Sequence, residues 1–73
     1  MKVITSERMQ HRWSRAELGR QARVHPARVG QIESGRVVPY DRELARIAAA
    51  LEWESDPRVL LTEAVGGVRS GIS

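Results

Sequence analysis

Residues 14–35 read SRAELGRQARVHPARVGQIESG, and this stretch predicts the centre of the fold. It opens with Ser14, and Glu17 follows three residues later. That is the spacing of a capping box, in which each side chain accepts a hydrogen bond from the other residue's free backbone N–H. Leu18 and two alanines supply apolar content behind it. We therefore predict a helix over residues 14–22.

A second helix start lies at His25-Pro26, just after a break at Arg23-Val24. Proline costs nothing at the first helical position, because its missing N–H would have no partner there. Gly35 is a typical helix stop, since glycine readily adopts the left-handed conformation that ends a helix. The pattern therefore predicts a second helix over residues 25–34.

Two short helices joined by a tight turn form the helix-turn-helix arrangement. It needs small residues where the helices cross, and Gly19 and Ala22 supply them. It also needs an apolar residue in the turn to fill the crossing, and Val24 stands there. Val29 and Ile32 give the second helix its apolar inward face.

Helical patterns also flank this pair. Residues 3–10 predict a helix with a weak apolar stripe. Residues 41–51 predict a better one, because four apolar residues recur there at the i, i+3, i+4 and i+7 spacing of a core-facing stripe. These four are Leu44, Ile47, Ala48 and Leu51.

A fifth, short helix is predicted from Asp56-Pro57 to about Val65, before Gly66-Gly67. No segment alternates apolar and polar residues over enough positions to indicate a strand. We therefore predict an all-α fold, a compact bundle of about five short helices. Residues 1–65 would form one domain, followed by a flexible tail at 66–73.

Composition and charge narrow the function classes. The 73 residues contain no cysteine, which excludes disulfides and thiolate metal sites and fits a cytoplasmic protein. Residues 12–36 hold six arginines against two glutamates, whereas residues 37–73 hold four arginines against six acids. The basic half fits a nucleic-acid partner. On charge alone, a solvated surface explains it equally well.

The ordered set of residues resembles the family of phage lambda repressor and Cro, a helix-turn-helix family of bacterial and phage transcriptional regulators. The matching residues are Arg8, Ser14, Glu17, Leu18, Val24, Val29, Ile32, Glu33, Gly35, Pro39, Leu44, Ile47, Ala48 and Leu51, with Leu60 and Leu61 as a terminal apolar pair. The sequence departs from the family where Arg12 and Arg23 replace common glycines, and where Glu7 replaces an apolar residue.

The resemblance implies sequence-specific binding of double-stranded DNA, with residues 25–34 in the major groove. By position, Ser14, Arg15 and Arg36 are implied phosphate contacts, and Pro26, Ala27, Arg28 and Gln31 lie at groove-facing positions. His25 is interpreted equally as a phosphate contact or a helix cap. Gln31 can form two hydrogen bonds with the edge of an adenine. Arg28 can do the same with a guanine if it reaches a base rather than a phosphate. Arg8 and Glu33 are implied to form a structural ion pair.

Family members of this length commonly dimerise after the fourth helix. The resemblance therefore implies a dimerisation region at 53–65 and a homodimer interface at Trp53, Val59, Leu60 and Val65. The implied role is a transcriptional regulator, either a repressor or a controller. An alternative is a protein-interaction module, such as an antitoxin that neutralises a protein partner, with DNA binding secondary. A non-specific DNA or RNA binder is a third hypothesis.

The residue pattern predicts no enzyme, because no spacing of serine, histidine and acid supports a catalytic triad. It predicts no cofactor, and two histidines without cysteine indicate no metal site. No apolar run is long enough to span a membrane. Trp13 and Trp53 are interpreted as core or dimer-packing residues rather than recognition aromatics, and Tyr40 as a loop residue rather than a phosphate contact.

Overall fold

The computed structural model describes residues 1–64. In chain order they form α1 (Val3–Gln10), α2 (Arg15–Ala22), α3 (Pro26–Ser34), α4 (Asp41–Ala50) and the 3-10 helix η1 (Pro57–Leu61). The all-helical class is confirmed over these residues, where the only extended pairing is a single antiparallel bridge between Lys2 and Glu63. The predictions made for Val65 and for a tail at 66–73 fall outside the described residues.

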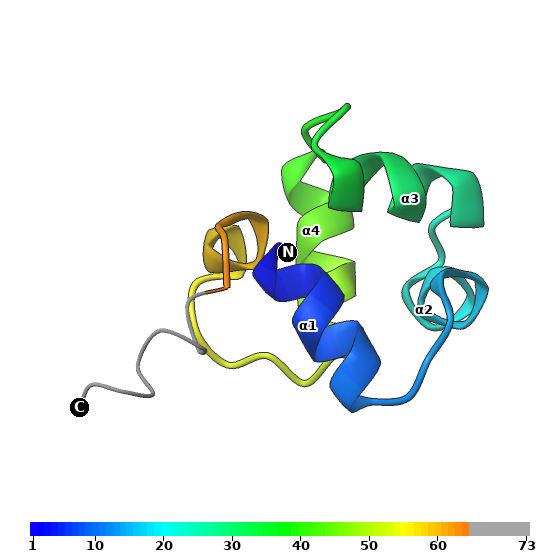
Figure 1. The fold of residues 1–73 in the computed structure, drawn as a ribbon, viewed down its shortest axis with the longest axis horizontal. Coiled ribbons are helices and arrows are strands. Elements are labelled where there is room, and N and C mark those ends of the chain that lie inside the picture. Colours follow the sequence, from blue (N-terminus) through cyan, green and yellow to red (C-terminus); the bar gives the residue numbers. More distant parts are fainter. Residues whose placement is uncertain (65–73) are drawn as a thin grey trace.

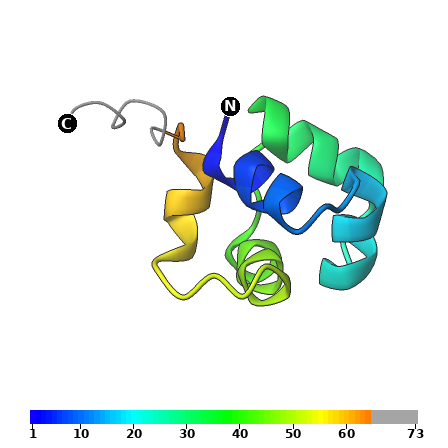
Figure 2. The same cartoon turned by 60° about the horizontal axis from the view of Figure 1, so that its bottom comes forward.

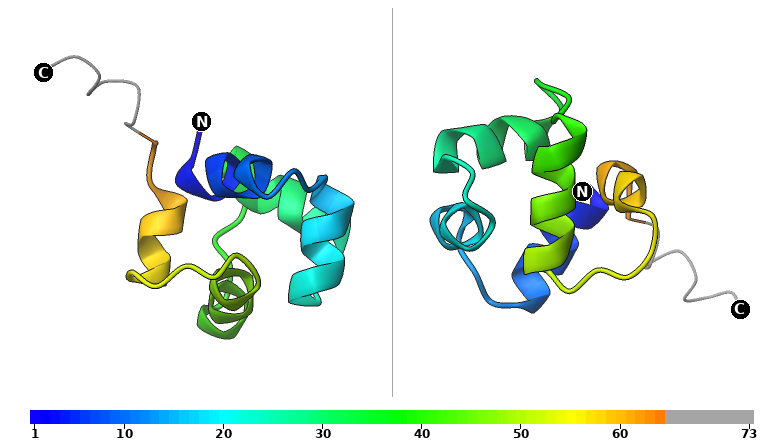
Figure 3. Two further views of the ribbon diagram at one scale, coloured as in Figure 1. Left: turned by 90° about the horizontal axis from the view of Figure 1, so that it is seen from below. Right: turned by 180° about the vertical axis from the view of Figure 1, so that it is seen from behind.

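Helix α4 lies at the centre of the arrangement (Figure 1). From behind, α2 and η1 flank α4 on opposite sides, and α3 runs across one end of it (Figure 3). Helix α2 packs on both α3 and α4, whereas η1 packs on α1 and α4. No helix within residues 1–64 has the length and apolar character needed to cross a membrane.

The core is built from apolar residues of every helix. Six side chains are essentially fully buried, namely Ile4, Leu18, Val29, Ile32, Ile47 and Leu60. The predicted α4 stripe faces inward as a unit, because Leu44, Ile47, Ala48 and Leu51 are all buried. Burial of apolar surface is the main force that holds so small a domain together.

Local capping groups set the starts of α2 and α3. Ser14 Oγ accepts a hydrogen bond from the backbone N–H of Glu17 at 3.0 Å. The reciprocal bond of the predicted capping box is not formed, because the Glu17 carboxylate instead accepts from Arg20 and Gln21 along the same helix. His25 Nδ1 accepts from the backbone N–H of Ala27 at 3.1 Å, so this histidine caps α3.

Left-handed residues follow all four α-helices. Gly35 does so after α3, with φ of 82°, where glycine carries no steric cost. The other three are not glycine: Arg12, Arg23 and Glu52 have φ of 62°, 61° and 58°. Two of these are the positions where the sequence departs from the family's glycines. Side chains with a Cβ atom pay a conformational penalty in this region.

Replacing Arg23 with glycine is expected to raise the free energy of unfolding by about 0.5–1 kcal/mol, because relief of left-handed strain outweighs the added chain entropy. Urea unfolding followed by helical circular dichroism measures the change. Arg20→Gly is the matched control, since Arg20 lies inside α2 and its replacement should cost about 1 kcal/mol. Equal losses in both variants would contradict a left-handed Arg23.

The prediction of a fifth helix reaching Val65 is wrong within the described residues, because η1 ends at Leu61. Pairing with the start of the chain explains the early end. The carbonyl of Thr62 accepts a hydrogen bond from the N–H of Val3 at 2.8 Å, and the carbonyl of Met1 accepts one from the N–H of Ala64 at 2.8 Å. These bonds need extended backbone, so the chain leaves the helical conformation and runs beside its N-terminal residues (Figure 2).

Candidate nucleic-acid interface

Helices α2 and α3 meet at Gly19. A Cβ atom there would overlap the carbonyl oxygen of Val24 and lie 3.3 Å from the backbone nitrogen of Pro26. The carbonyl of Gly19 accepts from the N–H of Val24 at 2.8 Å, which closes the turn. The Val24 side chain is buried in the core. This close crossing fixes the start of α3 relative to the C-terminal half of α2.

One long face of α3 is turned away from the core. Val29, Ile32 and Glu33 are buried on its inner side. The outer side exposes Pro26, Ala27, Gln31 and Ser34, which include three of the residues predicted to face a DNA groove. Because Ala27, Gln31 and Ser34 follow the i, i+4, i+7 spacing, they form one strip along the helix.

The start of α2 lies beside this strip. Ser14 and Arg15 are both exposed, and the side chain of Arg15 retains 59% of its accessible surface. A Cβ atom on Gly30 would come within 3.7 Å of Arg15 Cδ, so the arginine stem passes over the middle of α3. Arg15 Nε donates to Glu33 Oε1 at 3.1 Å. The predicted phosphate contact is therefore at the surface and also anchored to α3.

The Arg8 and Glu33 side chains form the pair that the resemblance implied. Arg8 Nε donates to Glu33 Oε2 at 2.7 Å, and Arg8 Nη2 donates to Oε1 at 3.3 Å. Arg8 Nη1 also donates to the carbonyl of Trp13 at 2.8 Å. The two side chains are only 12% and 3% exposed. With Arg15, the pair ties α1 and the start of α2 to α3.

Comparison with known proteins agrees with this geometry. The profile of the helix-turn-helix domain family matches residues 5–61. The chain belongs to this family. No curated protein and no solved structure matched the chain. Helix-turn-helix domains bind DNA, and the exposed sides of α2 and α3 are therefore the candidate interface.

Arg28 of this helix-turn-helix domain is not aligned with the exposed strip. Its Nη2 and Nε donate to Glu43 at 2.9 and 3.2 Å, and its guanidinium lies 5.5 Å from the centre of the Tyr40 ring. The hydrogen bond from Arg28 and that from the backbone N–H of Tyr40 hold the pKa of Glu43 below its ordinary value. Sequence analysis did not single out Glu43, because no local pattern links residues fifteen apart on different helices.

Further basic residues border the strip beyond the end of α3. Arg36 is exposed after the Gly35 stop, as expected for a phosphate contact. Arg42, in the first turn of α4, is also exposed and lies 5.9 Å from the centre of the Tyr40 ring. Sequence analysis did not single out Arg42. Tyr40 itself is 65% exposed.

Both tryptophans are partly buried against the core of the helix-turn-helix domain. Trp13 stacks on His11, with ring centres 4.6 Å apart, and His11 Nε2 lies 3.0 Å from the carbonyl oxygen of Leu51. Trp53 Nε1 donates to the carbonyl of Asp56 at 3.1 Å. These contacts place the two rings in packing roles within one chain and away from the exposed strip of α3.

The residues predicted for a dimer interface divide into three groups. Leu60 is completely buried in its own chain, so it offers no surface to a partner. Its burial follows from η1 packing on α1 and α4. Val59 is 39% exposed and Trp53 is partly buried, so both retain surface. Val65 lies beyond the described residues.

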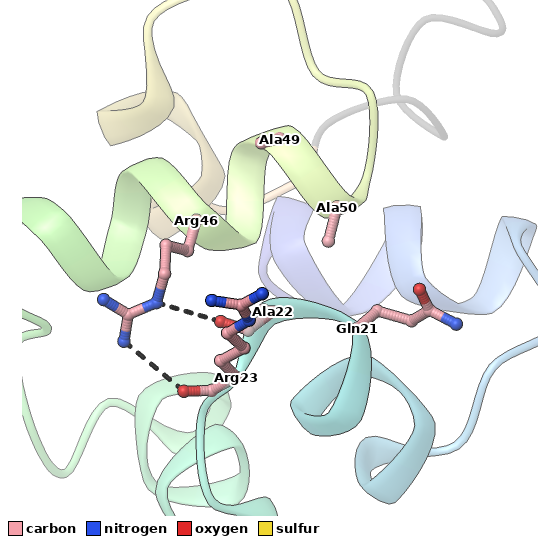
Figure 4. A pocket seen from close by; sticks show the side chains of 6 residues that line it. All are labelled: Gln21, Ala22, Arg23, Arg46, Ala49 and Ala50. Atoms are coloured by element: carbon pink, nitrogen blue, oxygen red, sulfur yellow. Dashed lines mark hydrogen bonds between the residues drawn. The ribbon is translucent and has the colours of Figure 1, made fainter.

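A shallow hollow of about 330 Å³ lies between the C-terminal ends of α2 and α4 (Figure 4). Its floor is apolar, and Arg46 crosses its edge to donate to the carbonyls of Ala22 at 3.0 Å and Arg23 at 3.4 Å. These contacts satisfy the last carbonyls of α2, where a cation is favoured. Residues 1–64 contain no cluster of three metal-ligating side chains.

Proposed function

We propose that this chain is a sequence-specific transcriptional regulator of the lambda repressor and Cro class, acting as a repressor or a controller. In this proposal α3 enters the major groove of double-stranded DNA. The observation that carries it is the exposed strip of Ala27, Gln31 and Ser34 next to the exposed start of α2. The family match supports DNA as the partner.

Each exposed group has a specific role in the proposal. The unpaired amides at the N-terminus of α2 attract a phosphate. Arg15 adds a cation beside the middle of α3, and Arg36 adds one just after its C-terminal end. Gln31 forms two hydrogen bonds with the edge of an adenine, whereas Pro26 and Ala27 make apolar contacts with thymine methyl groups. Because so few side chains reach bases, DNA shape supplies part of the specificity.

Selection from a randomised duplex pool at near-physiological salt tests this function. Enrichment of a motif with few strongly fixed positions supports it. Salt-sensitive binding without enrichment would contradict sequence specificity, because phosphate contacts alone produce it. The absence of binding would overturn the DNA function and favour a module that binds a protein partner.

The proposal includes a two-fold dimer in which Trp53 and Val59 contribute surface. Such a dimer reads a palindrome whose half-sites lie about 10 base pairs apart. The mass of the protein–DNA complex at saturating protein tests it, with two chains expected on each palindrome. One chain per site would contradict the dimer and leave DNA binding intact.

Two substitutions separate base contacts from phosphate contacts. Gln31→Ala is expected to weaken the preference for adenine at one position of the motif, with a loss of about 1–3 kcal/mol of discrimination against other bases. Arg36→Ala should weaken binding to all sequences alike. It should also reduce by about 1 the slope of the logarithm of the binding constant against the logarithm of the salt concentration. Fluorescence anisotropy across a salt series measures both effects.

Arg58→Ala, measured on a single half-site so that the proposed dimer contacts at Trp53 and Val59 do not contribute, is the control for Arg36→Ala. Arg58 carries the same charge but lies on η1, on the opposite side of α4 from α2. Its removal should leave the DNA affinity nearly unchanged. If Arg58→Ala weakened binding as much as Arg36→Ala, net charge rather than the proposed surface would explain the binding.

A further inference from the structure

Arg28 stands beside the groove-facing strip but is held away from it. It precedes Gln31 by three residues, and residues at that spacing are neighbours on a helix surface. Its side chain nevertheless turns toward α4, where Nη2 lies 2.9 Å from Glu43 Oε1 and Nε lies 3.2 Å from Oε2. A two-pronged arginine–carboxylate contact of this kind fixes both the position and the plane of the guanidinium.

The surroundings of Glu43 make this contact persistent. The Glu43 side chain is only 15% exposed, and that of Arg28 is 28% exposed. Glu43 Oε1 also accepts a hydrogen bond from the backbone N–H of Tyr40 at 2.9 Å, which holds the carboxylate at the start of α4. The guanidinium carbon of Arg28 lies over the Tyr40 ring, 5.5 Å from the centre of the ring. The carboxylate is therefore fixed before any DNA arrives.

The guanidinium of an arginine can donate two hydrogen bonds either to a carboxylate or to the edge of a guanine. Arginine recognises guanine by donating two hydrogen bonds to O6 and N7. In this structure Nε and Nη2 of Arg28 already donate to the two oxygens of Glu43. The two donors that would bind guanine are therefore already used, and the guanidinium points toward α4.

We propose that Glu43 determines the specificity of this domain by withholding Arg28 from the bases. The assignment rests on the proposed DNA-binding function. It means that the native motif lacks the guanine that a free arginine at this position of α3 selects. It also means that a single neutral substitution in α4, outside the recognition helix, changes the base preference.

Motif selection with four proteins tests the proposal: the native chain, Glu43→Gln, Arg28→Met and the double variant. Glutamine keeps the length of the side chain and an oxygen for the Tyr40 N–H, but it removes the charge that holds Arg28. We expect Glu43→Gln to gain a guanine in each half-site, preferred about 5- to 100-fold over other bases. The native, Arg28→Met and double-variant motifs should agree with one another at that position.

Two results would overturn the assignment while leaving the DNA function intact. One is an unchanged motif in a folded Glu43→Gln protein. The other is a guanine that is present in the native motif and lost from the Arg28→Met motif. That loss would show that Arg28 already contacts a base while Glu43 is present. If none of the four proteins binds DNA, the proposed function fails and the assignment fails with it.

Discussion

Replacing Glu33 with alanine is expected to lower the free energy of unfolding by about 3–5 kcal/mol. The Glu33 carboxylate accepts from Arg8 at 2.7 and 3.3 Å and from Arg15 at 3.1 Å. Its loss leaves the guanidinium of Arg8, which is only 12% exposed, without a counter-charge. Since small domains are stable by about 5–15 kcal/mol in total, much of the population should unfold on mild heating.

Denaturant titration followed by circular dichroism measures this loss, and a double variant separates its causes. Arg8→Met with Glu33→Met removes both charges and keeps apolar volume, so it should recover most of the stability lost in Glu33→Ala. A loss below about 1 kcal/mol in Glu33→Ala would show that the pair behaves as an exposed surface salt bridge.

Replacing Gly19 with alanine is expected to destabilise the domain by about 1–3 kcal/mol, the usual range of strain from overpacking. Alanine normally stabilises a helix interior by about 1 kcal/mol relative to glycine, so the sign is reversed here. The added methyl group would overlap the carbonyl oxygen of Val24. Because that oxygen belongs to the backbone of the turn, it cannot move aside as a flexible side chain can.

Gly30→Ala is the matched control for this reversal. Gly30 lies within α3, where a Cβ atom would meet only Arg15 Cδ at an ordinary contact distance of 3.7 Å. Its substitution should therefore stabilise the fold by up to about 1 kcal/mol. Thermal unfolding of both variants measures the difference, and a stabilised Gly19→Ala protein would contradict the close crossing.

Local chemistry explains which parts of the fold could be predicted from the sequence. The starts of α2 and α3 depend on Ser14, His25 and Pro26, and the end of α3 depends on Gly35; each acts on backbone groups a few residues away. The core stripe of α4 is likewise visible as a local period. The boundaries predicted from these signals therefore agree with the observed helices to within a residue.

Contacts between distant segments explain what could not be predicted. Ser14 and Glu17 have the spacing of a capping box, yet only one of its two hydrogen bonds forms, because Arg20 and Gln21 donate to the Glu17 carboxylate. The Arg28–Glu43 contact depends on how α3 and α4 are placed around the loop. The exposed strip of α3 was accessible to prediction because it follows from helical spacing, whereas the orientation of Arg28 follows from tertiary packing.

The bridge between Lys2 and Glu63 has a consequence for the order in which the chain folds. It joins residues near opposite ends of the described chain, so it closes a loop of about 60 residues, and the entropy cost of closing a loop rises with its length. The contacts at Gly19 and Val24 close over only a few residues and form faster. The crossing of α2 and α3 can therefore assemble while the two ends of the domain are still apart.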